Sequence, residues 1–161
     1  MLKKTMNFKS TVISNSRFLY KKTNCLSERW NILLAEIDSF VNYSNSLTFL
    51  SPSFFFHVES PFSSQKFKGE VWVGREVTGH SFLPEDFYFL DIEKGEAIVF
   101  NGSGPERGVD FDSIDHEVWN SMSENGQKRV FTCRVKMTPW KKNAQTEIDL
   151  KPEIQYFLEQ T

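Results

Sequence analysis

Apolar residues recur at every third or fourth position in one segment of the chain, residues 27–43. This spacing gathers the apolar side chains on one face of an α-helix. Ser27 is a suitable N-cap, since its hydroxyl can accept a hydrogen bond from an amide of the first turn, and the polar residues from Asn42 onward end the segment. The pattern predicts a helix that packs on the remainder of the protein through Trp30, Leu33, Leu34, Ile37 and Phe40.

Short strands are predicted for most of the remaining chain. Apolar and polar residues alternate from Met6 to Ile13, as in a strand with one buried face. Glu93-Lys94-Gly95 is a turn signal and predicts a hairpin between the strands on either side of it. After Pro139 the chain is polar, with a short helix or strand at 152–159. Apolar runs bounded by turn residues predict further strands over residues 47–59, 70–76, 87–92, 96–100, 113–119 and 128–137.

The length of 161 residues suits one domain with a single hydrophobic core. One helix beside several short strands predicts a mostly β (α+β) fold, a barrel or sandwich of the jelly-roll type with the helix packed outside. We expect a single domain over residues 1–161. Its parts are a basic strand-like segment at 1–24, the helix at 27–43, a β body at 47–140 and a polar C-terminal tail at 141–161.

Composition and charge narrow the classes of partner. The formal net charge of −2 gives no field that attracts a polyanion, so we expect no nucleic-acid partner. No apolar run approaches the roughly 18 residues of a membrane helix, so no membrane partner is expected. The acid-free residues 1–24 fit a basic first strand better than a targeting segment. Two distant cysteines, Cys25 and Cys133, favour free thiols in a reducing, cytoplasmic compartment.

Acidic side chains gather in the middle of the sequence, where residues 85–124 hold eleven acidic and two basic residues. Three interpretations fit: a solvated loop and strand edge, which we favour, a calcium site, or a docking patch for a basic protein. We expect residues 101–112 to form an exposed, mobile loop, because glycines and like charges resist burial. The docking patch would consist of Glu106, Asp110, Asp112, Asp115 and Glu117.

Strand parity predicts an arginine and a histidine in the interior. In residues 128–137, Arg129 begins the apolar face. An inward guanidinium is costly unless it meets a carboxylate or phosphate, or reaches water from the end of the strand. In residues 113–119, His116 lies on the apolar face and is expected inside. The polar face opposite Arg129 carries Val130, Thr132, Arg134 and Lys136.

A possible metal site follows from a second histidine. His57 and Glu59 lie two residues apart on one face of the strand predicted at 47–59, so both side chains can reach one point. With His116 from a neighbouring strand they would form the two-histidine, one-carboxylate set that binds Fe(II) and leaves coordination positions open. A lone buried histidine is more often a satisfied core residue, so the iron site is a hypothesis.

A segment in the acidic middle resembles a known enzyme family. Residues 112–120 (DSIDHEVWN) resemble the signature around the distal iron-binding histidine of the aspartyl/asparaginyl β-hydroxylases, and residues 94–100 resemble the strand that precedes it. Arg129 resembles the arginine that binds 2-oxoglutarate in that family. The resemblance covers about residues 70–140.

The resemblance implies a double-stranded β-helix, a jelly-roll or cupin-like fold, with Fe(II) bound by His116 and the cosubstrate 2-oxoglutarate held by Arg129. The first iron-binding histidine stays open between His57, with or without Glu59, and His80, or is missing, in which case the chain is not an active enzyme. The implied activity is that of a dioxygenase, an oxidoreductase that hydroxylates a C–H bond of an amino acid, a peptide or a related small molecule.

A non-catalytic binding module is the alternative. A small protein with an acidic patch suits an immunity or inhibitor protein for a basic toxin enzyme. The two hypotheses differ in the geometry that they require. The oxygenase needs His116 and Arg129 to converge on one pocket with a further histidine or carboxylate.

Overall fold

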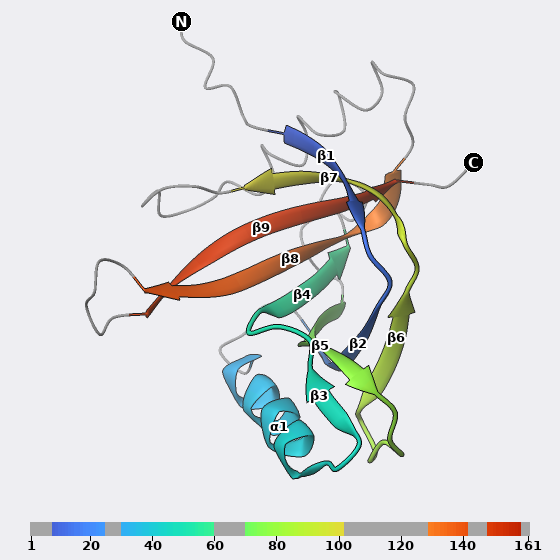
Figure 1. Ribbon diagram of the computed structural model, residues 1–161, viewed down its shortest axis with the longest axis vertical. Coiled ribbons are helices and arrows are strands. Elements are labelled where there is room, and N and C mark those ends of the chain that lie inside the picture. Colours follow the sequence, from blue (N-terminus) through green and yellow to red (C-terminus); the bar gives the residue numbers. More distant parts are fainter. Residues whose placement is uncertain (1–7, 25–29, 60–69, 102–128, 142–147, 159–161) are drawn as a thin grey trace, which may run out of the picture.

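The computed structural model describes residues 8–24, 30–59, 70–101, 129–141 and 148–158, which form nine strands and one helix (Figure 1). The helix is α1 (Trp30–Tyr43). The strands are β1 (Phe8–Ile13), β2 (Ser16–Asn24), β3 (Leu47–Phe49), β4 (Phe54–Glu59), β5 (Glu70–Gly79), β6 (Tyr88–Ile92), β7 (Gly95–Asn101), β8 (Arg129–Lys141) and β9 (Ile148–Leu158). The expectation of a mostly β fold with one helix is confirmed. No helix in this part of the chain is long and apolar enough to cross a bilayer.

All strands belong to one antiparallel sheet with the order β1-β7-β9-β8-β4-β5-β2-β6, and β3 pairs with β5 beside this path. Only two residues separate β1 from β2, and two separate β6 from β7. These two bent strands pair in one unbroken register, from Phe8 opposite Phe100 to Tyr20 opposite Tyr88. Both ends of the strand order therefore lie in the same bent ribbon, which is seen at the right of Figure 1.

The strand order has an internal twofold pattern. If β1 is exchanged with β6, β2 with β7, β4 with β8 and β5 with β9, the strand order of the sheet becomes its own reverse. The two topologically equivalent halves meet where β4 pairs with β8, from Phe54 opposite Met137 to Glu59 opposite Thr132. A face of the sheet at this junction is therefore built from both halves of the chain.

Several expected elements differ from the observed ones. Residues 47–59 form two strands, because the chain leaves the sheet around Pro52, which cannot donate to a strand ladder. The hairpin expected at Glu93-Lys94-Gly95 is wrong, since β6 and β7 pair with β2 and β1 and not with each other. In the tail expected at 141–161, the short helix or strand predicted at 152–159 is a strand, β9, which begins earlier, at Ile148, and lies in the middle of the sheet. The double-stranded β-helix is not confirmed by this topology.

Helix α1 packs on the sheet as the apolar spacing predicts. Leu34, Ile37 and Val41 are buried. The ring of Trp30 stacks on Phe54, with centroids 5.5 Å apart, and meets Phe56 edge-on. The helix therefore covers the side of the sheet to which the even-numbered residues of β4 point. We call the opposite side of the sheet the inner face.

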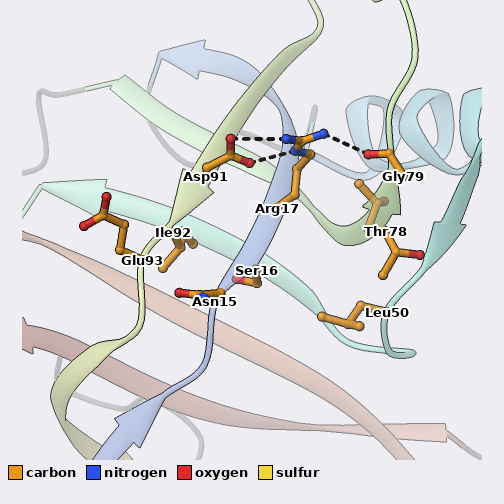
Figure 2. A pocket seen from close by; sticks show the side chains of 10 residues that line it. Asn15, Ser16, Arg17, Leu50, Thr78, Gly79, Asp91, Ile92 and Glu93 are labelled. Carbon is orange, nitrogen blue, oxygen red and sulfur yellow. Dashed lines mark hydrogen bonds and ion pairs between the residues drawn. The ribbon is translucent and has the colours of Figure 1, made fainter.

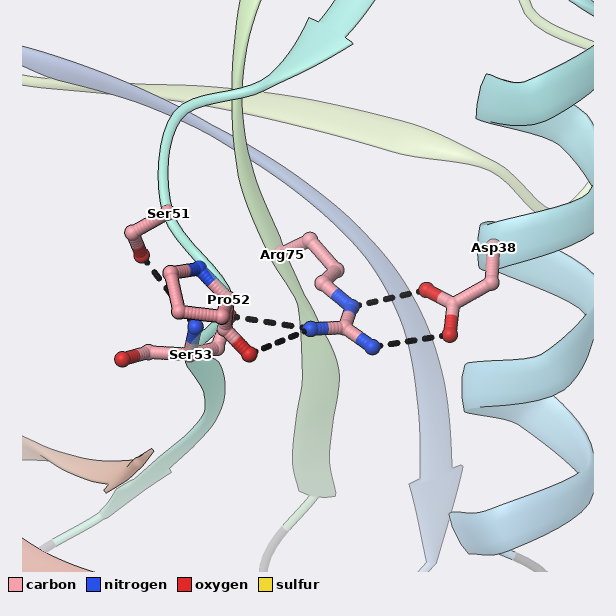
Figure 3. A network of polar contacts seen from close by, with 5 residues as sticks. All are labelled: Asp38, Ser51, Pro52, Ser53 and Arg75. Atoms are coloured by element: carbon pink, nitrogen blue, oxygen red, sulfur yellow. Dashed lines mark hydrogen bonds and ion pairs between the residues drawn. The ribbon is translucent and has the colours of Figure 1, made fainter. Parts of the chain in front are cut away.

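An ion pair fixes α1 to the sheet (Figure 3). The guanidinium of Arg75 on β5 donates to both carboxylate oxygens of Asp38, at 2.7 and 2.8 Å. It also donates to the backbone carbonyl of Pro52 at 2.8 Å. Paired hydrogen bonds of this kind fix orientation as well as distance. Arg75 therefore ties the helix, β5 and the turn before β4 together on the outer side.

Strand β4 is apolar on both sides of the sheet. Phe54 and Phe56 belong to the core under α1, whereas Phe55 is fully buried against Phe18 on the inner face. A strand that is apolar in consecutive positions is typical of a sheet covered on both faces. The inner face is therefore not a solvated surface near β4.

Candidate functional site

Four rings from four neighbouring strands form a row across the inner face: Tyr88 on β6, Tyr20 on β2, Trp72 on β5 and His57 on β4. The ring centroids of successive members are 5.5, 4.3 and 5.2 Å apart, and their planes differ by 23°, 10° and 24°. We call this set the aromatic row. Near-parallel rings at these spacings are favourable stacked contacts. The row is a continuous π surface that no single strand could supply.

The strand register explains why these rings meet. Tyr20 lies directly opposite Tyr88 on one side and Gly74 on the other, and Trp72 lies opposite His57. Cross-strand pairs on one face of a sheet bring side chains into contact. Gly74 has no side chain to separate the rings, and a Cβ there would lie 1.9 Å from the backbone oxygen of Leu19. Only glycine allows the close approach of β2 and β5 at this point.

The side-chain ammonium of Lys22 lies over the aromatic row. The Nζ atom of Lys22 lies 4.4 Å from the ring centroid of Tyr88 and 5.4 Å from that of Trp72. Lys22 is exposed, and its residue pairs directly with Trp72 across β2 and β5. An ammonium within about 6 Å of a ring centroid is attracted by the negative face of the ring. The exposed side of the row is therefore a surface on which positive charge is stable.

A buried ion pair lies on the inner face beside the row. Arg134 on β8 is only 1% exposed, and its Nη1 lies 3.2 Å from Oε2 of Glu76 on β5. Its Nε donates to Oε1 of Gln155 at 2.9 Å, and Gln155 in turn donates to Glu153 at 2.7 Å. The guanidinium also lies 4.2 Å from the ring centroid of Phe55. Burial lowers the pKa of Arg134, and the Glu76 carboxylate opposes this shift.

His57 lies between the row and this ion pair. Burial, together with the positive charge of Arg134, lowers the pKa of His57 from its usual 6.5 to about 4. Its Nδ1 atom is buried and has no hydrogen-bond partner among the residues that the structure describes. His57 is therefore neutral at pH 7 and acts as an aromatic ring rather than as a charge.

Acidification should destabilise the protein through His57. The native state resists protonation of this ring, whereas the unfolded chain binds the proton below about pH 6.5, so the free energy of unfolding should fall as the pH drops from about 6.5 towards 4. We expect a loss of about 2–3 kcal/mol between about pH 7 and pH 4.5 from this group. Urea unfolding of wild type and His57→Phe at both pH values measures it, because the variant keeps a ring and loses the titration. An equal pH dependence in both proteins would contradict the prediction, and His80→Gln is the control.

A hollow of about 500 Å³ opens where the two bent strands turn (Figure 2). Arg17 crosses it and donates to both carboxylate oxygens of Asp91, at 2.7 and 3.2 Å, and to the carbonyl of Gly79 at 2.9 Å. This pairing raises the pKa of Arg17 and lowers that of Asp91. The ion pair satisfies its own charges, so the hollow presents no obvious reactive group. Its lining is completed by Asn15, Ser16, Leu50, Val77, Thr78, Ile92 and Glu93.

The structure tests only part of the predicted iron site. The parity expected for His57 is confirmed, because it shares the inner face with Phe55. His80 is exposed in the segment after β5, 3.4 Å from the Arg17 guanidinium. Glu59 and Arg129 lie in described strands, opposite Thr132 and Leu158, but their side chains are outside the described part. No three His, Cys, Asp or Glu side chains in that part lie close enough together to bind one metal ion.

The remaining sequence-based expectations lie outside the described residues. These are the strand at 113–119 with His116, the loop expected at 101–112 except for Asn101, which ends β7, the thiols of Cys25 and Cys133, and the acidic patch of Glu106, Asp110, Asp112, Asp115 and Glu117. The iron site and the docking patch therefore stay predictions.

Sequence reasoning missed the buried arginine of the inner face. The alternation in residues 128–137 places Arg134 on the polar face of its strand, with Thr132 and Lys136. A signal was present in the neighbouring strand, since Phe54, Phe55 and Phe56 are consecutive and must bury both sides of the sheet. Strand β8 pairs with β4, so the polar side of β8, which carries Arg134, is covered as well.

No family model and no curated protein matches the chain. Solved structures do resemble it. The crystal structure of the EcmrR C-terminal domain has a TM-score of 0.75 at 16% sequence identity, over 98% of this chain and 99% of that one. A cryo-EM structure of an EcmrR–DNA complex gives a TM-score of 0.73 at 16% identity, over 96% of this chain and 58% of that one.

Two further structures are less similar. A hydrolase from Listeria innocua has a TM-score of 0.59 at 10% identity, over 96% of this chain and 92% of that one. The structure of SAV2435 bound to tetraphenylphosphonium has a TM-score of 0.51 at 12% identity, over 96% of this chain and 94% of that one. At such identities a likeness carries the fold and not the function. The chain thus shares its fold with the EcmrR C-terminal domain.

Proposed function

We propose that the protein is a non-catalytic binding domain whose aromatic row takes up an aromatic organic cation. The observation that carries the proposal is the ammonium of Lys22, which lies over the rings of Tyr88 and Trp72. A row of stacked rings is suited to flat or ring-bearing ligands, and the negative π faces favour positive charge over negative.

The polar groups beside the row suit binding better than catalysis. Arg134 is held by Glu76 and Gln155, so its charge is already compensated inside the protein. His57 is neutral at pH 7 and lies against Phe18 and Trp72. A ligand cation would take the place of the Lys22 ammonium over the same rings.

The shared fold supports a ligand of this class. SAV2435 was solved with tetraphenylphosphonium, a cation that carries four phenyl rings. EcmrR was solved with DNA, and this chain covers 58% of that protein's chain. For this chain we propose only an aromatic organic cation as the ligand, because the aromatic row is an independent reason to expect that class. The absence of a nucleic-acid partner stays a prediction.

Removing the central ring of the row should abolish most of the affinity. We expect Trp72→Ala to weaken the binding of tetraphenylphosphonium roughly tenfold to thirtyfold, because the variant loses a cation–π contact worth about 0.5–1 kcal/mol at an exposed site and a ring–ring contact worth about 0.5–1.5 kcal/mol. Trp72→Phe should retain part of the affinity. Isothermal titration calorimetry with tetraphenylphosphonium chloride measures all three proteins.

The matched control for this experiment is Tyr43→Ala, which removes a ring that is 89% exposed on α1 and away from the row. It should leave the affinity unchanged. The proposal is wrong if the wild type does not bind the cation, or if Trp72→Ala binds it as tightly as the wild type does.

The Fe(II)- and 2-oxoglutarate-dependent oxygenase stays a second candidate, since His116 and the side chain of Arg129 lie outside the described residues. Its substrate would be an amino acid, a peptide or a related small molecule. The specific observation in its favour is that His57 presents a buried Nδ1 atom without a described hydrogen-bond partner. Anaerobic titration with Fe(II) and 2-oxoglutarate in the same calorimeter separates the two candidates. A basic protein partner stays a prediction of the acidic patch.

A further inference from the structure

We propose that Lys22 is an intramolecular competitor that selects which cations the aromatic row accepts. The inference rests on the proposed function and concerns the regulation of the same surface. In the unliganded protein the ammonium of Lys22 occupies the position that a ligand cation would take. A ligand must displace this ammonium before it can contact the rings.

The position of Lys22 on β2 makes the competition local. It lies two residues from Tyr20 on the same face, directly opposite Trp72, and its Nζ reaches over Tyr88 at 4.4 Å. A second positive charge cannot share this place, because like charges at contact distance repel. Lys22 is exposed and has a long, flexible stem, so displacement moves the ammonium into water without unfolding the strand.

The need to displace Lys22 limits which cations can bind to the aromatic row. A small, strongly hydrated cation gains no more from the rings than the ammonium that it replaces, so it has no advantage. A cation that bears several aromatic groups contacts more than one ring and sheds less bound water, so it can displace Lys22. The row should therefore discriminate against small amines and inorganic cations in favour of bulky aromatic ones.

Neutralising Lys22 should improve binding rather than impair it. We expect Lys22→Gln to bind tetraphenylphosphonium about two- to fivefold more tightly than the wild type, because an exposed cation–π contact no longer competes. Lys22→Arg should bind it more weakly than the wild type, since a guanidinium stacks better on aromatic rings than an ammonium does. Tetraphenylborate has the same shape and the opposite charge, and Lys22→Gln should bind it no more tightly than the wild type.

Lys21→Gln is the matched control. Lys21 is the neighbouring residue on β2 and also lies over a ring, 4.5 Å from the centroid of Phe87, but it pairs with Glu36 of α1 on the outer side. The substitution removes the same charge from the opposite face and should leave both affinities unchanged. A similar gain in Lys21→Gln would mean that net charge and not local competition is responsible.

Titration calorimetry of the full chain with both ions measures these affinities, and equal urea midpoints check that the variants are folded. The inference is overturned if wild type binds tetraphenylphosphonium and Lys22→Gln binds it equally or more weakly. If neither wild type nor Lys22→Gln binds the ion, the proposed function itself fails and the inference falls with it.

Discussion

Replacing Arg134 by methionine should lower the free energy of unfolding by about 3–5 kcal/mol, because the substitution leaves the Glu76 carboxylate buried without its cation. Arg134 is 1% exposed and the side chain of Glu76 beside it is 12% exposed, so water cannot replace the lost partner. The loss also removes the hydrogen bond to Gln155 and the contact with Phe55. Urea unfolding followed by circular dichroism at pH 7 measures the change.

The double variant Arg134→Met with Glu76→Leu separates burial of a lone charge from loss of packing. We expect it to recover most of the stability, since replacing both members of a buried pair by apolar groups of similar size is often neutral. Arg17→Met is the exposed control, because its partner Asp91 lies in solvent, and it should change the urea midpoint little. A double variant as unstable as Arg134→Met would contradict this account.

Gly74→Ala should cost about 3 kcal/mol of stability, at the upper end of what overpacking in a core costs. The added Cβ would meet the Leu19 carbonyl oxygen at 1.9 Å and the Cα of Tyr20 at 2.8 Å. Both are backbone atoms of β2, which pairs with β5 over eight residues and cannot move without breaking that ladder. Urea unfolding measures the loss, and near-ultraviolet circular dichroism reports on the rings of Tyr20 and Trp72 above the site.

Thr78→Ala is the control, since Thr78 lies on the same strand and is exposed. It loses only a side-chain contact with Thr48 and should change stability slightly. A wild-type urea midpoint and an unchanged near-ultraviolet spectrum in Gly74→Ala would show that β2 and β5 can separate here. The close approach of the two strands would then not be needed to hold the aromatic row together.

Helix α1 and the strand-rich character of the chain were predictable because each depends on local spacing. Three-four periodicity identified Trp30, Leu34 and Ile37 as the buried face of the helix, and they pack where the pattern placed them. Period-two alternation identified most of the strands. It also separated the two sides of β4, so that His57 was expected on the same face as Phe55.

Strand neighbours were not predictable in the same way. Glu93-Lys94-Gly95 has the composition of a hairpin turn, but the strands on either side of it pair with β1 and β2. Residues 148–158 look polar, with Asp149, Lys151 and Glu153, and nevertheless lie between β7 and β8. In both cases the partner strand, far away in sequence, determines the outcome. Local turn propensity and polarity carry little information about such partners.

The sequence by itself determined where the helix lies, that the fold is mostly β, and which residues of β4 share a face. Only the tertiary structure decided that Arg134 is buried with Glu76, and that rings from residues 20, 57, 72 and 88 form one row under Lys22. The physical reason is the range of the interactions. Periodicity and turn chemistry act between neighbours in the chain, whereas strand register and the burial of both sheet faces depend on contacts between distant segments.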